Sequence, residues 1–542
     1  MNDLLLYFHT LRYLKPVQIY GRLWFRLRRP TPDLRPAPAL QPTAGDWIRC
    51  ARHASMLGAT TFRFLSVTRE AGTAADWNRV DWPKLWLYNL HYFDDLNAED
   101  ATARVAWHRA LMARWIAENP PAAGNGWEPY PLSLRLVNWV KWAAAGNALE
   151  SGAVQSLAVQ ARWLMGRLEW HLLGNHLLAN AKALVFAGIF FAGAEADQWR
   201  QKGLAILRRE HAEQILDDGG HFERSPMYHA IILEDLLDLI QLAIRWPGVI
   251  DAATVVEWRR QAARMLDWLA AMTHPDGEIA LFNDAAFGIA PNLAALVGYA
   301  AAWDIDTPAS ITTPLTLLRE SGYLRAQGED AVLIADAGEI GPDYLPGHAH
   351  ADTLAFELSV FGQRVVVNSG ISEYGLGAER LRQRGTAAHS TVQIDDADSS
   401  EVWSGFRVAR RARPLGLSFS EGDDALDLAC AHDGYLRLKG RPLHRRSWRM
   451  SARRLQVNDS IVGGFEQAVA YYHLHPAVRV SGDSGEGVLQ LPDGHTMRWA
   501  ARGGAARIVP STWHPAFGQS IPSTCLQIVF AGPQATMEFF WD

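Results

Sequence analysis

The sequence of 542 residues contains little cysteine and no long hydrophobic run. Its three cysteines, Cys50, Cys430 and Cys525, lie far apart, which excludes a disulfide framework and a paired-cysteine metal motif. The longest apolar run, residues 183–194, is shorter than the ~20 residues needed to cross a bilayer. It predicts a buried helix, and the sequence predicts no membrane span.

The chain also lacks an excess of basic residues and a recognisable leader. A net charge of −6 and a pI near 6.3 argue against a nucleic-acid partner. No basic region precedes the first apolar stretch, so a signal peptide is not predicted. We therefore expect a cytoplasmic protein, or a periplasmic one if a leader has been removed. The oligomeric state stays open.

The pattern of apolar residues changes once along the chain. From about residue 100 to 305, apolar residues recur near every 3.6 positions in segments joined by short loops, which predicts successive antiparallel helices. After about residue 315, short β-rich runs alternate with Gly, Asp and Pro turns, which predicts an antiparallel sandwich. We expect an α+β multidomain protein: an incomplete α/α toroid over 1–310, with an irregular Pro-rich segment at 1–95, then a β-sandwich over 311–542.

Polar residues cluster in a few short stretches. "GHAHAD" places His348, His350 and Asp352 at a spacing of two, either as a polar, solvated strand start or as a functional group. We expect an irregular backbone here, permitted by Gly347. Asn175, in "HLLGNHLLANAKAL", is either a helix N-cap or an amide directed into a cleft. Tyr228, in "GGHFERSPMYH", is either packed in the core or catalytic.

These stretches lack one feature that a glycoside hydrolase requires. Hydrolysis needs two carboxylates across the scissile bond, and Glu223 and Asp352 form no evident pair. Tyrosine, histidine and asparagine recur instead. That set suits proton transfer at a carbon beside a carboxylate: a Tyr or His moves the proton, and amide or imidazole donors stabilise the enolate-like transition state.

Six motifs in order along the chain carry a family resemblance: "WPKLWLYNLHYFDDL", "GNGWEPYPLSLRLVNW", "GNHLLANAKAL", "HFERSPMYH", "GHAHAD" and "RGTAAHSTV". With these motifs the chain resembles the heparinase II/III-like polysaccharide lyases, which combine an α/α toroid with a β-sandwich. The resemblance implies β-elimination on an acidic, uronate-containing polysaccharide, leaving 4,5-unsaturated ends. It implies that Tyr228 protonates the leaving oxygen, that Asn175 and His176 hold the carboxylate, and that His348 is the catalytic histidine of the sandwich.

Substrate-binding residues are expected within and near the same motifs. The tryptophans, 22 in all, suit either helix packing or stacking on sugars. The predicted substrate-binding residues are Tyr88, His91, Trp127, Arg135, Glu223, Arg384 and Trp403.

The resemblance also implies a zinc site. His350 and His389 match two ligands, while Asn368 stands where the family usually has Asp. Because an amide is a poor zinc ligand, weak binding with a structural role is one expectation; hydrogen bonds that brace the loop are the other. No organic cofactor is predicted.

Two other functions stay open. A hydrolase on the same scaffold would need a carboxylate pair, and a non-catalytic glycan-binding protein of exopolysaccharide assembly would keep the groove without the chemistry. The sequence does not specify the polymer. Without a leader, a bacterial exopolysaccharide or capsule system is favoured over scavenging of host glycans.

Overall fold

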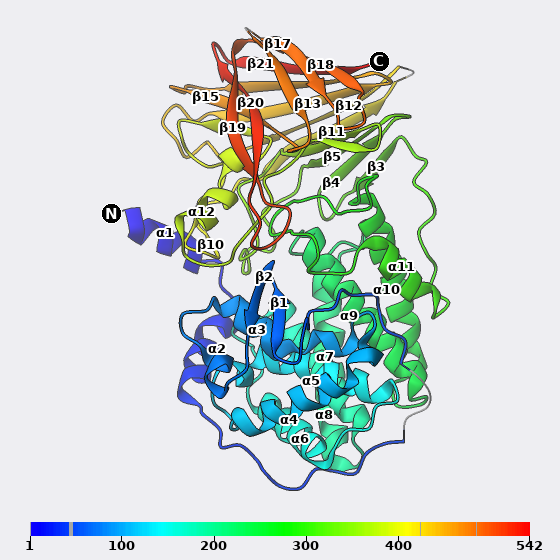
Figure 1. The fold of residues 1–542 in the computed structure, drawn as a ribbon. Helices are drawn as coiled ribbons and strands as arrows, with labels where there is room; N and C mark the ends of the chain where they lie inside the picture. The colour runs from blue at the N-terminus through cyan, green and yellow to red at the C-terminus, as the bar shows by residue number, and fades with distance from the viewer. Residues whose placement is uncertain (1, 43–46, 423, 484) are drawn as a thin grey trace.

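The computed structural model describes residues 2–42, 47–422, 424–483 and 485–542. A helical region forms the lower half of Figure 1, and two packed β-sheets form the upper half. The last helix of the lower half is α11 (Leu293–Ala301), and the first strand of the upper half is β3 (Leu315–Leu318). The change in apolar pattern near residue 310 therefore coincides with the change of architecture, and the α+β prediction is confirmed.

The helical region is an open array in which successive helices pack side by side. Within the described residues this array does not close into a barrel. This agrees with the prediction of an incomplete toroid. Its helices before α11 are α3 (Lys84–Tyr92), α4 (Val105–Glu118), α5 (Pro129–Ala144), α6 (Ser151–Gly166), α7 (Gly174–Phe190), α8 (Ala194–Gln214), α9 (Pro226–Arg245) and α10 (Ala252–Ala271).

Helix α7 lies at the centre of this array. It contacts α5, α6, α8 and α9, and every residue in it except His176 is buried. Residues 183–190 of the apolar run pack on all sides, which explains why they show no amphipathic stripe. Residues 191–194 of the run lie beyond the end of α7. The one outward-facing side chain, His176, belongs to the first turn, where α7 points toward the sandwich.

The segment 1–95 is not irregular as predicted. It contains α1 (Asn2–Leu11), α2 (Pro16–Leu27), the hairpin β1 (Thr61–Phe64) and β2 (Val67–Glu70), and α3. Pro16 stands at the first position of α2, where its missing N–H costs nothing. Only the proline-rich stretch that follows α2 is extended, up to residue 42; its end at 43–45 lies outside the described residues.

The upper half consists of two antiparallel sheets. One has the order β11-β12-β13-β14-β21-β18-β17-β16; the other runs β19-β20-β15-β7-β6-β5-β4-β3, with β8 paired to β15. The strands of the first sheet are β11 (Pro414–Glu421), β12 (Ala425–His432), β13 (Leu443–Ser451), β14 (Arg454–Val462), β16 (Arg479–Asp483), β17 (Glu486–Gln490), β18 (Thr496–Arg502) and β21 (Gln534–Trp541). Those of the second are β4 (Tyr323–Gln327), β5 (Ala331–Asp336), β6 (Phe356–Val360), β7 (Gln363–Val366), β8 (Val392–Ile394), β15 (Ala468–Leu474), β19 (Gly504–Trp513) and β20 (Ile521–Phe530), besides β3.

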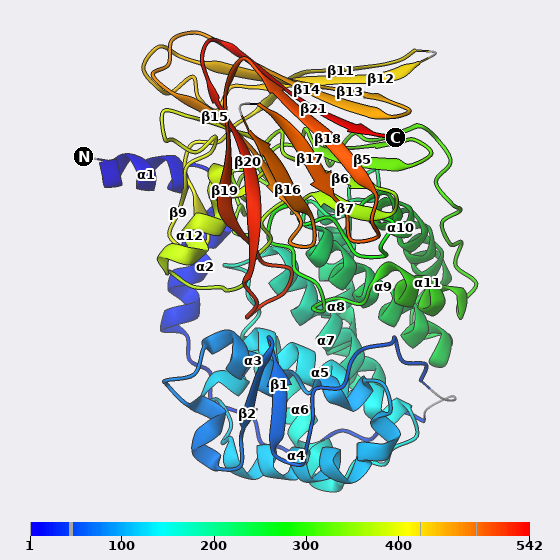
Figure 2. The ribbon, with the colours of Figure 1, turned by 45° about the horizontal axis from the view of Figure 1, so that its top comes forward.

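Side chains alternate along these strands as expected for a sandwich. On β13 and β14 every second residue is buried, because one face of the sheet packs against the other sheet. Figure 2 shows the two sheets stacked above the helices.

The tryptophans mostly fill the helical core. Trp77, Trp86, Trp115, Trp139 and Trp142 are each no more than 1% exposed, which supports packing over sugar stacking for these five residues. Among the described residues, no helix is both long and apolar enough to cross a membrane.

Loops at the junction of the two halves bring the predicted site together. The loop before α9 and the N-terminus of α7 come from the helices. The β5–β6 connection, the segment 370–377 and α12 (Ala378–Arg384) come from the sandwich. The backbone around "GHAHAD" is irregular, as predicted. Gly347, however, has no left-handed φ, so it does not permit this shape in the way expected.

Candidate active site

Tyr228 and His348 form the centre of the site. Tyr228 is the third residue of α9, and its amide donates to the N-cap hydroxyl of Ser225 at 3.2 Å. Its ring stacks on the imidazole of His348, with centroids 3.9 Å apart. Tyr228 is 8% exposed, while the His348 side chain is 16% exposed. The structure therefore brings together a helix residue and a sandwich residue that lie 120 positions apart in sequence.

A buried carboxylate orients His348. Glu223, 2% exposed, is hydrogen-bonded to Nδ1 of His348. Burial raises the pKa of Glu223, but the His348 ring outweighs this and leaves the pKa lowered, so the carboxylate is ionised and accepts the Nδ1 proton. Nε2 of His348 then carries the free lone pair, which suits a general base.

The Tyr228 hydroxyl lies 3.0 Å from the hydroxyl of Tyr374. Burial, and then the neighbouring Tyr374, raises the pKa of Tyr228 well above its ordinary value. Tyr228 is therefore a neutral phenol at physiological pH and can donate a proton.

Asn175 is the second residue of α7, so it is not the N-cap; that position belongs to Leu173. Its amide makes no side-chain hydrogen bond to any residue that the structure describes, although Asn175 is only 6% exposed. A backbone in the left-handed region at Leu173 (φ 64°) and Gly174 (φ 54°) sets this first turn. An unbonded amide beside the free N–H groups of a helix N-terminus suits a carboxylate ligand.

His176 follows Asn175 in the first turn of α7. Its ring lies 4.5 Å from that of Tyr130, and its Nδ1 is 3.3 Å from a carboxylate oxygen of Glu169. Burial lowers the pKa of His176, but Glu169 outweighs this and leaves the pKa raised. His176 thus favours the cationic form, which complements a uronate.

Behind His348 lies a chain of buried polar groups. Nε2 of His350 is 2.8 Å from Asp284, and Nδ1 of His350 is 3.3 Å from Nε2 of His389. Arg380 makes a two-pronged ion pair with Asp284. Burial opposes ionisation of Asp284, yet Arg380 and His350 hold its pKa well below the usual range. His350 therefore donates Nε2–H to Asp284 and presents a lone pair to His389.

The residues present fit a divalent metal. His350, Asp352 and His389 are each no more than 1% exposed, and one donor atom from each lies within 4.8 Å of the others. Burial lowers the pKa of His350 to about 4 and of His389 to about 3, so both imidazoles are neutral ligands. Two imidazoles and one carboxylate are a common zinc donor set.

Asp352 is a carboxylate that lies near the two histidines. Asp352 follows His350 by two residues, whereas the Asn368 oxygen accepts a long bond, 3.4 Å, from the Ser390 amide. The Asn368 amide nitrogen is buried without a partner in the described part of the chain. Asp352 thus joins the predicted ligands His350, His389 and Asn368 as a further candidate.

Five of the seven predicted substrate-binding residues are buried, and four of these, His91, Trp127, Arg135 and Arg384, have partners in the interior rather than at the centre of the site. His91 and Arg135 are fully buried; Arg135 donates to the carbonyls of His91 and Gly126. Trp127 is 4% exposed, and its indole donates to Asn119 O. Arg384 is fully buried and donates to Ala349 O and Gly405 O, so it braces the loop that carries His348.

The other three have partners within the protein. Glu223 is buried against His348, which makes it a positioning residue and corrects its assignment to substrate contact. Half-buried Tyr88 is hydrogen-bonded to Glu128. Trp403 packs against α1, where its indole donates to Thr10 at 3.0 Å.

Four residues that were not predicted from the sequence are brought to the site by the fold: Tyr374, Phe406, Asp284 and Arg380. Phe406 lies three residues after Trp403, and its ring is 5.3 Å from Tyr374 and 6.3 Å from His348. The stretch "SEYGLGAERLRQRG" directly before "TAAHS" held the one available signal for Tyr374 and Arg380.

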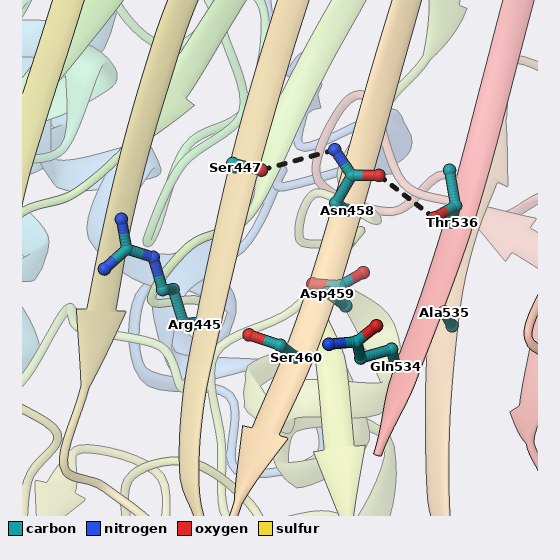
Figure 3. A pocket seen from close by; sticks show the side chains of 8 residues that line it. All are labelled: Arg445, Ser447, Asn458, Asp459, Ser460, Gln534, Ala535 and Thr536. Atoms are coloured by element: carbon teal, nitrogen blue, oxygen red, sulfur yellow. Dashed lines mark hydrogen bonds between the residues drawn. The ribbon is translucent and has the colours of Figure 1, made fainter. Parts of the chain in front are cut away.

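A separate hollow of about 270 Å³ lies on the outer face of β13, β14 and β21 (Figure 3). Asn458 bridges Ser447 and Thr536 across it. The residues that line it include no aromatic ring and no free carboxylate, so it offers neither a sugar-stacking platform nor the proton-transfer groups found around His348.

Two family models match the chain, and each covers one half of the architecture. Residues 147–299 match the model described as Heparinase II/III N-terminus, and residues 310–541 match Heparinase II/III-like, C-terminal.

Among curated proteins, a heparin-sulfate lyase of Bacteroides stercoris is 26% identical over 43% of this chain and 37% of its own length. FtsZ-localized protein C of Caulobacter vibrioides is 29% identical over 62% of this chain and 54% of its own length. The chain thus spans about a third to a half of the length of these relatives. A solved structure of a heparan sulfate lyase from Pedobacter heparinus superposes with a TM-score of 0.60 at 17% identity, covering 97% of this chain and 88% of that one.

Proposed function

We propose that this chain, which belongs to the heparinase II/III-like family, is a polysaccharide lyase that cleaves a uronate-containing acidic polysaccharide by β-elimination. One observation carries the proposal: a partly exposed histidine, oriented by a buried carboxylate, stacks on a neutral tyrosine at the junction of the two halves. The pair supplies a base and an acid side by side.

The reaction follows from the protonation states. Nε2 of His348 removes the proton from C5 of the uronate, and the electron pair forms the C4–C5 double bond. The neutral Tyr228 hydroxyl gives its proton to the departing oxygen on C4. His348 ends as an imidazolium beside the Glu223 carboxylate, and Tyr228 ends as a phenolate. The imidazolium proton then returns to Tyr228 through solvent or through Tyr374, whose hydroxyl lies 3.0 Å from that of Tyr228, so that both groups are restored. Each proton lost by the substrate or gained by the leaving group is thereby accounted for.

Asn175 and His176 neutralise the carboxylate of the sugar. Negative charge grows on that group as the C5 proton leaves, so a hydrogen bond or cation placed there stabilises the transition state more than the ground state. The unbonded Asn175 amide and the raised pKa of His176 support this role.

Zinc is proposed as a structural ion held by His350, Asp352 and His389. When bound, it would cross-link the loop that carries His348 and act as a divalent counter-charge in the interior. His350 also receives support from Asp284, in the way that groups behind a ligand fix its ring.

The acidic surroundings of Tyr130 favour a polymer of low charge density. Burial, followed by Asp235, Glu169 and Asp94, raises the pKa of Tyr130. The nearby cation Lys182 is already paired with Asp235 and Asp238. Densely sulfated chains need free cations, so we propose an unsulfated or sparsely sulfated uronan, such as an exopolysaccharide or capsular polymer.

The test is a panel of uronate polymers, from heparin through unsulfated heparosan and hyaluronan to alginate. A lyase produces the ultraviolet absorbance of a conjugated unsaturated uronate. A hydrolase produces reducing ends without that absorbance, and a binding protein produces neither. Reducing ends without absorbance on any of these polymers would contradict elimination. Faster cleavage of heparin than of heparosan would contradict the assignment to low charge density.

A further inference from the structure

Exposed apolar side chains gather on the two N-terminal helices. Of the 25 large hydrophobic side chains exposed on the described part of the protein, ten belong to α1 and α2, which together make up a small fraction of the chain. These ten, called the N-terminal apolar face below, are Leu4, Leu5, Tyr7, Phe8, Leu11, Ile19, Tyr20, Leu23, Trp24 and Leu27. An apolar patch of this kind marks a binding surface.

Helix α2 is amphipathic, but its apolar stripe faces solvent, whereas an ordinary surface helix turns its apolar stripe toward the core. Ile19, Leu23 and Leu27 recur every four residues on the solvent side, 60%, 61% and 72% exposed. The opposite side packs on the helical region, with Gly21 against His171. A helix that served only to cover the core would turn its apolar stripe inward.

Arginines border this stripe. Arg22 and Arg26 lie one turn apart beside it, and Arg28 and Arg29 follow at its end. None of the four forms an ion pair within the described ranges of the chain, and Asp3 is the one acidic residue before Pro30. The rest of the protein is acidic enough to bring the net charge to −6, so this basic segment contrasts with the whole.

A hollow of about 660 Å³ lies beside α2. It is formed by α2, the end of α6, the loop before α7 and the last turns of α8. Phe25, Met165 and Leu168 line it together with Arg28 and Arg167. Its acidic groups Glu213 and Glu210 are paired with Lys15 and Arg209. Apolar walls beside cationic groups provide room for lipid chains and headgroups.

We propose that the N-terminal apolar face docks this protein on the surface of an anionic phospholipid bilayer. Leucine, tryptophan and tyrosine side chains would enter the interface while the bordering arginines meet lipid phosphates, as in amphipathic helices that lie in the plane of a membrane. Figures 1 and 2 show α1 and α2 along one side of the molecule, where they bridge the helices and the sandwich. A plane could therefore contact both.

The charge and the apolar character of the N-terminal apolar face distinguish three possible partners: a second copy of the chain, an acidic polysaccharide and an anionic membrane. In a two-fold dimer the same patch meets itself, which would bring the unpaired arginines of both copies together. An acidic polysaccharide would meet the arginines but has no use for five large apolar side chains on α2. An anionic membrane satisfies both features. This inference does not depend on the proposed lyase activity.

Flotation of the full chain with vesicles tests the proposal. We expect binding to phosphatidylcholine vesicles that contain about a third phosphatidylglycerol, and much weaker binding to pure phosphatidylcholine. Because salt shortens the range of charge attraction, binding should weaken at high ionic strength. The triple variant L23S/W24S/L27S should reduce the bound fraction by about tenfold or more. These side chains are exposed, so the thermal midpoint should not change.

The matched control removes apolar side chains elsewhere. Leu415, Leu417 and Phe419 on β11 are 44%, 41% and 42% exposed, and L415S/L417S/F419S should leave vesicle binding unchanged. R22Q/R26Q should lower binding to anionic vesicles several-fold at low salt only. The proposal is overturned if the wild type does not float with anionic vesicles, or if the α2 triple variant floats as the wild type does. Light scattering that shows a dimer dissociated by the triple variant, without vesicle binding, would assign the face to a second copy instead.

Discussion

Two buried polar chains in this protein have nearly the same construction, and only one lies at the candidate site. In the first, Arg380 pairs with Asp284, Asp284 with His350, and His350 with His389. In the second, within the sandwich core, Arg446 pairs with Asp459, Asp459 with His444 at 2.8 Å, and His444 with His432 at 3.2 Å. The order Arg–Asp–His–His is the same in both.

The two chains differ in how they end. His432 accepts a hydrogen bond from the Gly434 amide at Nδ1, so its Nε2 carries the proton and donates to His444. Every proton in that chain has an acceptor. In the chain at the site, Nδ1 of His389 has no hydrogen-bond partner in the described residues, and Asp352 lies close by.

The difference teaches what makes a polar chain functional. Burial and an Arg–Asp pair alone build a rigid core, as in the sandwich. At the site the same parts leave donor atoms facing one another, which a metal ion would satisfy, and they support the loop that presents His348. The predictions below separate these two roles.

The largest expected effect comes from removing one tyrosine hydroxyl at the candidate site, compared with the same change in the sandwich core. Tyr228→Phe should lower kcat about 10²–10⁴-fold because the proton donor is lost while the ring stays. The matched change is Tyr472→Phe in the core, where the hydroxyl donates to Asp459 at 3.3 Å. It should leave kcat unchanged and cost about 1 kcal/mol of stability. Steady-state kinetics and thermal unfolding measure both. Tyr228→Phe with more than about a tenth of the wild-type kcat would remove the residue from the mechanism.

The second largest effect is expected when the buried aspartate of each polar chain is replaced. Asp284→Asn and Asp459→Asn each leave an arginine buried without its counter-charge, so each should cost about 3–5 kcal/mol of unfolding free energy. Both carboxyl pKa values are lowered in the folded protein. Their stabilisation is therefore present above the unfolded pKa of about 4 and is lost as the pH falls below it. Acid titration of unfolding should show this loss in the wild type and a smaller one in each variant.

Glu223→Gln should lower kcat by about 10²-fold, because a neutral amide no longer fixes the tautomer of His348 or stabilises its imidazolium. KM should change little, since Glu223 is 2% exposed and its carboxylate is hydrogen-bonded to His348. A raised KM with unchanged kcat would mean that Glu223 acts on substrate instead.

Zinc content should distinguish the polar chain at the candidate site from the polar chain in the sandwich core. Asp352→Asn should lower zinc per protein after dialysis, as measured by elemental analysis, because the carboxylate is lost. Asn368→Asp should raise it only if that side chain can also reach the ion. His444→Gln, in the core chain, should not alter it. Full zinc content in Asp352→Asn would mean that Asp352 is not a ligand and would favour the predicted set of His350, His389 and Asn368.

Much of the fold could be predicted from periodicity, since helices and strands bury their faces at different spacings. Helices α1 and α2 were not predicted, for two reasons. The prolines at 30–42 led to the prediction that the whole segment 1–95 is irregular, and α2 turns its apolar face outward. A pattern shows that a stripe exists, but it does not show what covers it.

The candidate site was only partly predictable. Asn175, Tyr228 and His348 lie in short motifs at the starts of elements. Asp284 and Arg380, however, are 96 residues apart and carry no local pattern. His91 and Arg135 illustrate the opposite error: a polar residue in a motif looks the same in sequence whether it faces a ligand or satisfies a backbone carbonyl in the core.

The smallest expected effect concerns Gly174, which lets the start of α7 lie close to Glu223, the residue that orients His348. Gly174 has φ +54°, and a Cβ there would lie 2.3 Å from Leu345 Cδ2 and 3.0 Å from Glu223 Oε1. Gly174→Ala should cost about 1–2 kcal/mol for the left-handed backbone and lower kcat a few-fold by displacing Glu223. Gly193, the residue before α8, has φ +96° with nothing near its Cβ position. Gly193→Ala should show a comparable loss of stability with unchanged kcat. Equal kcat losses in the two variants would mean that strain alone, and not contact with Glu223, reduces activity.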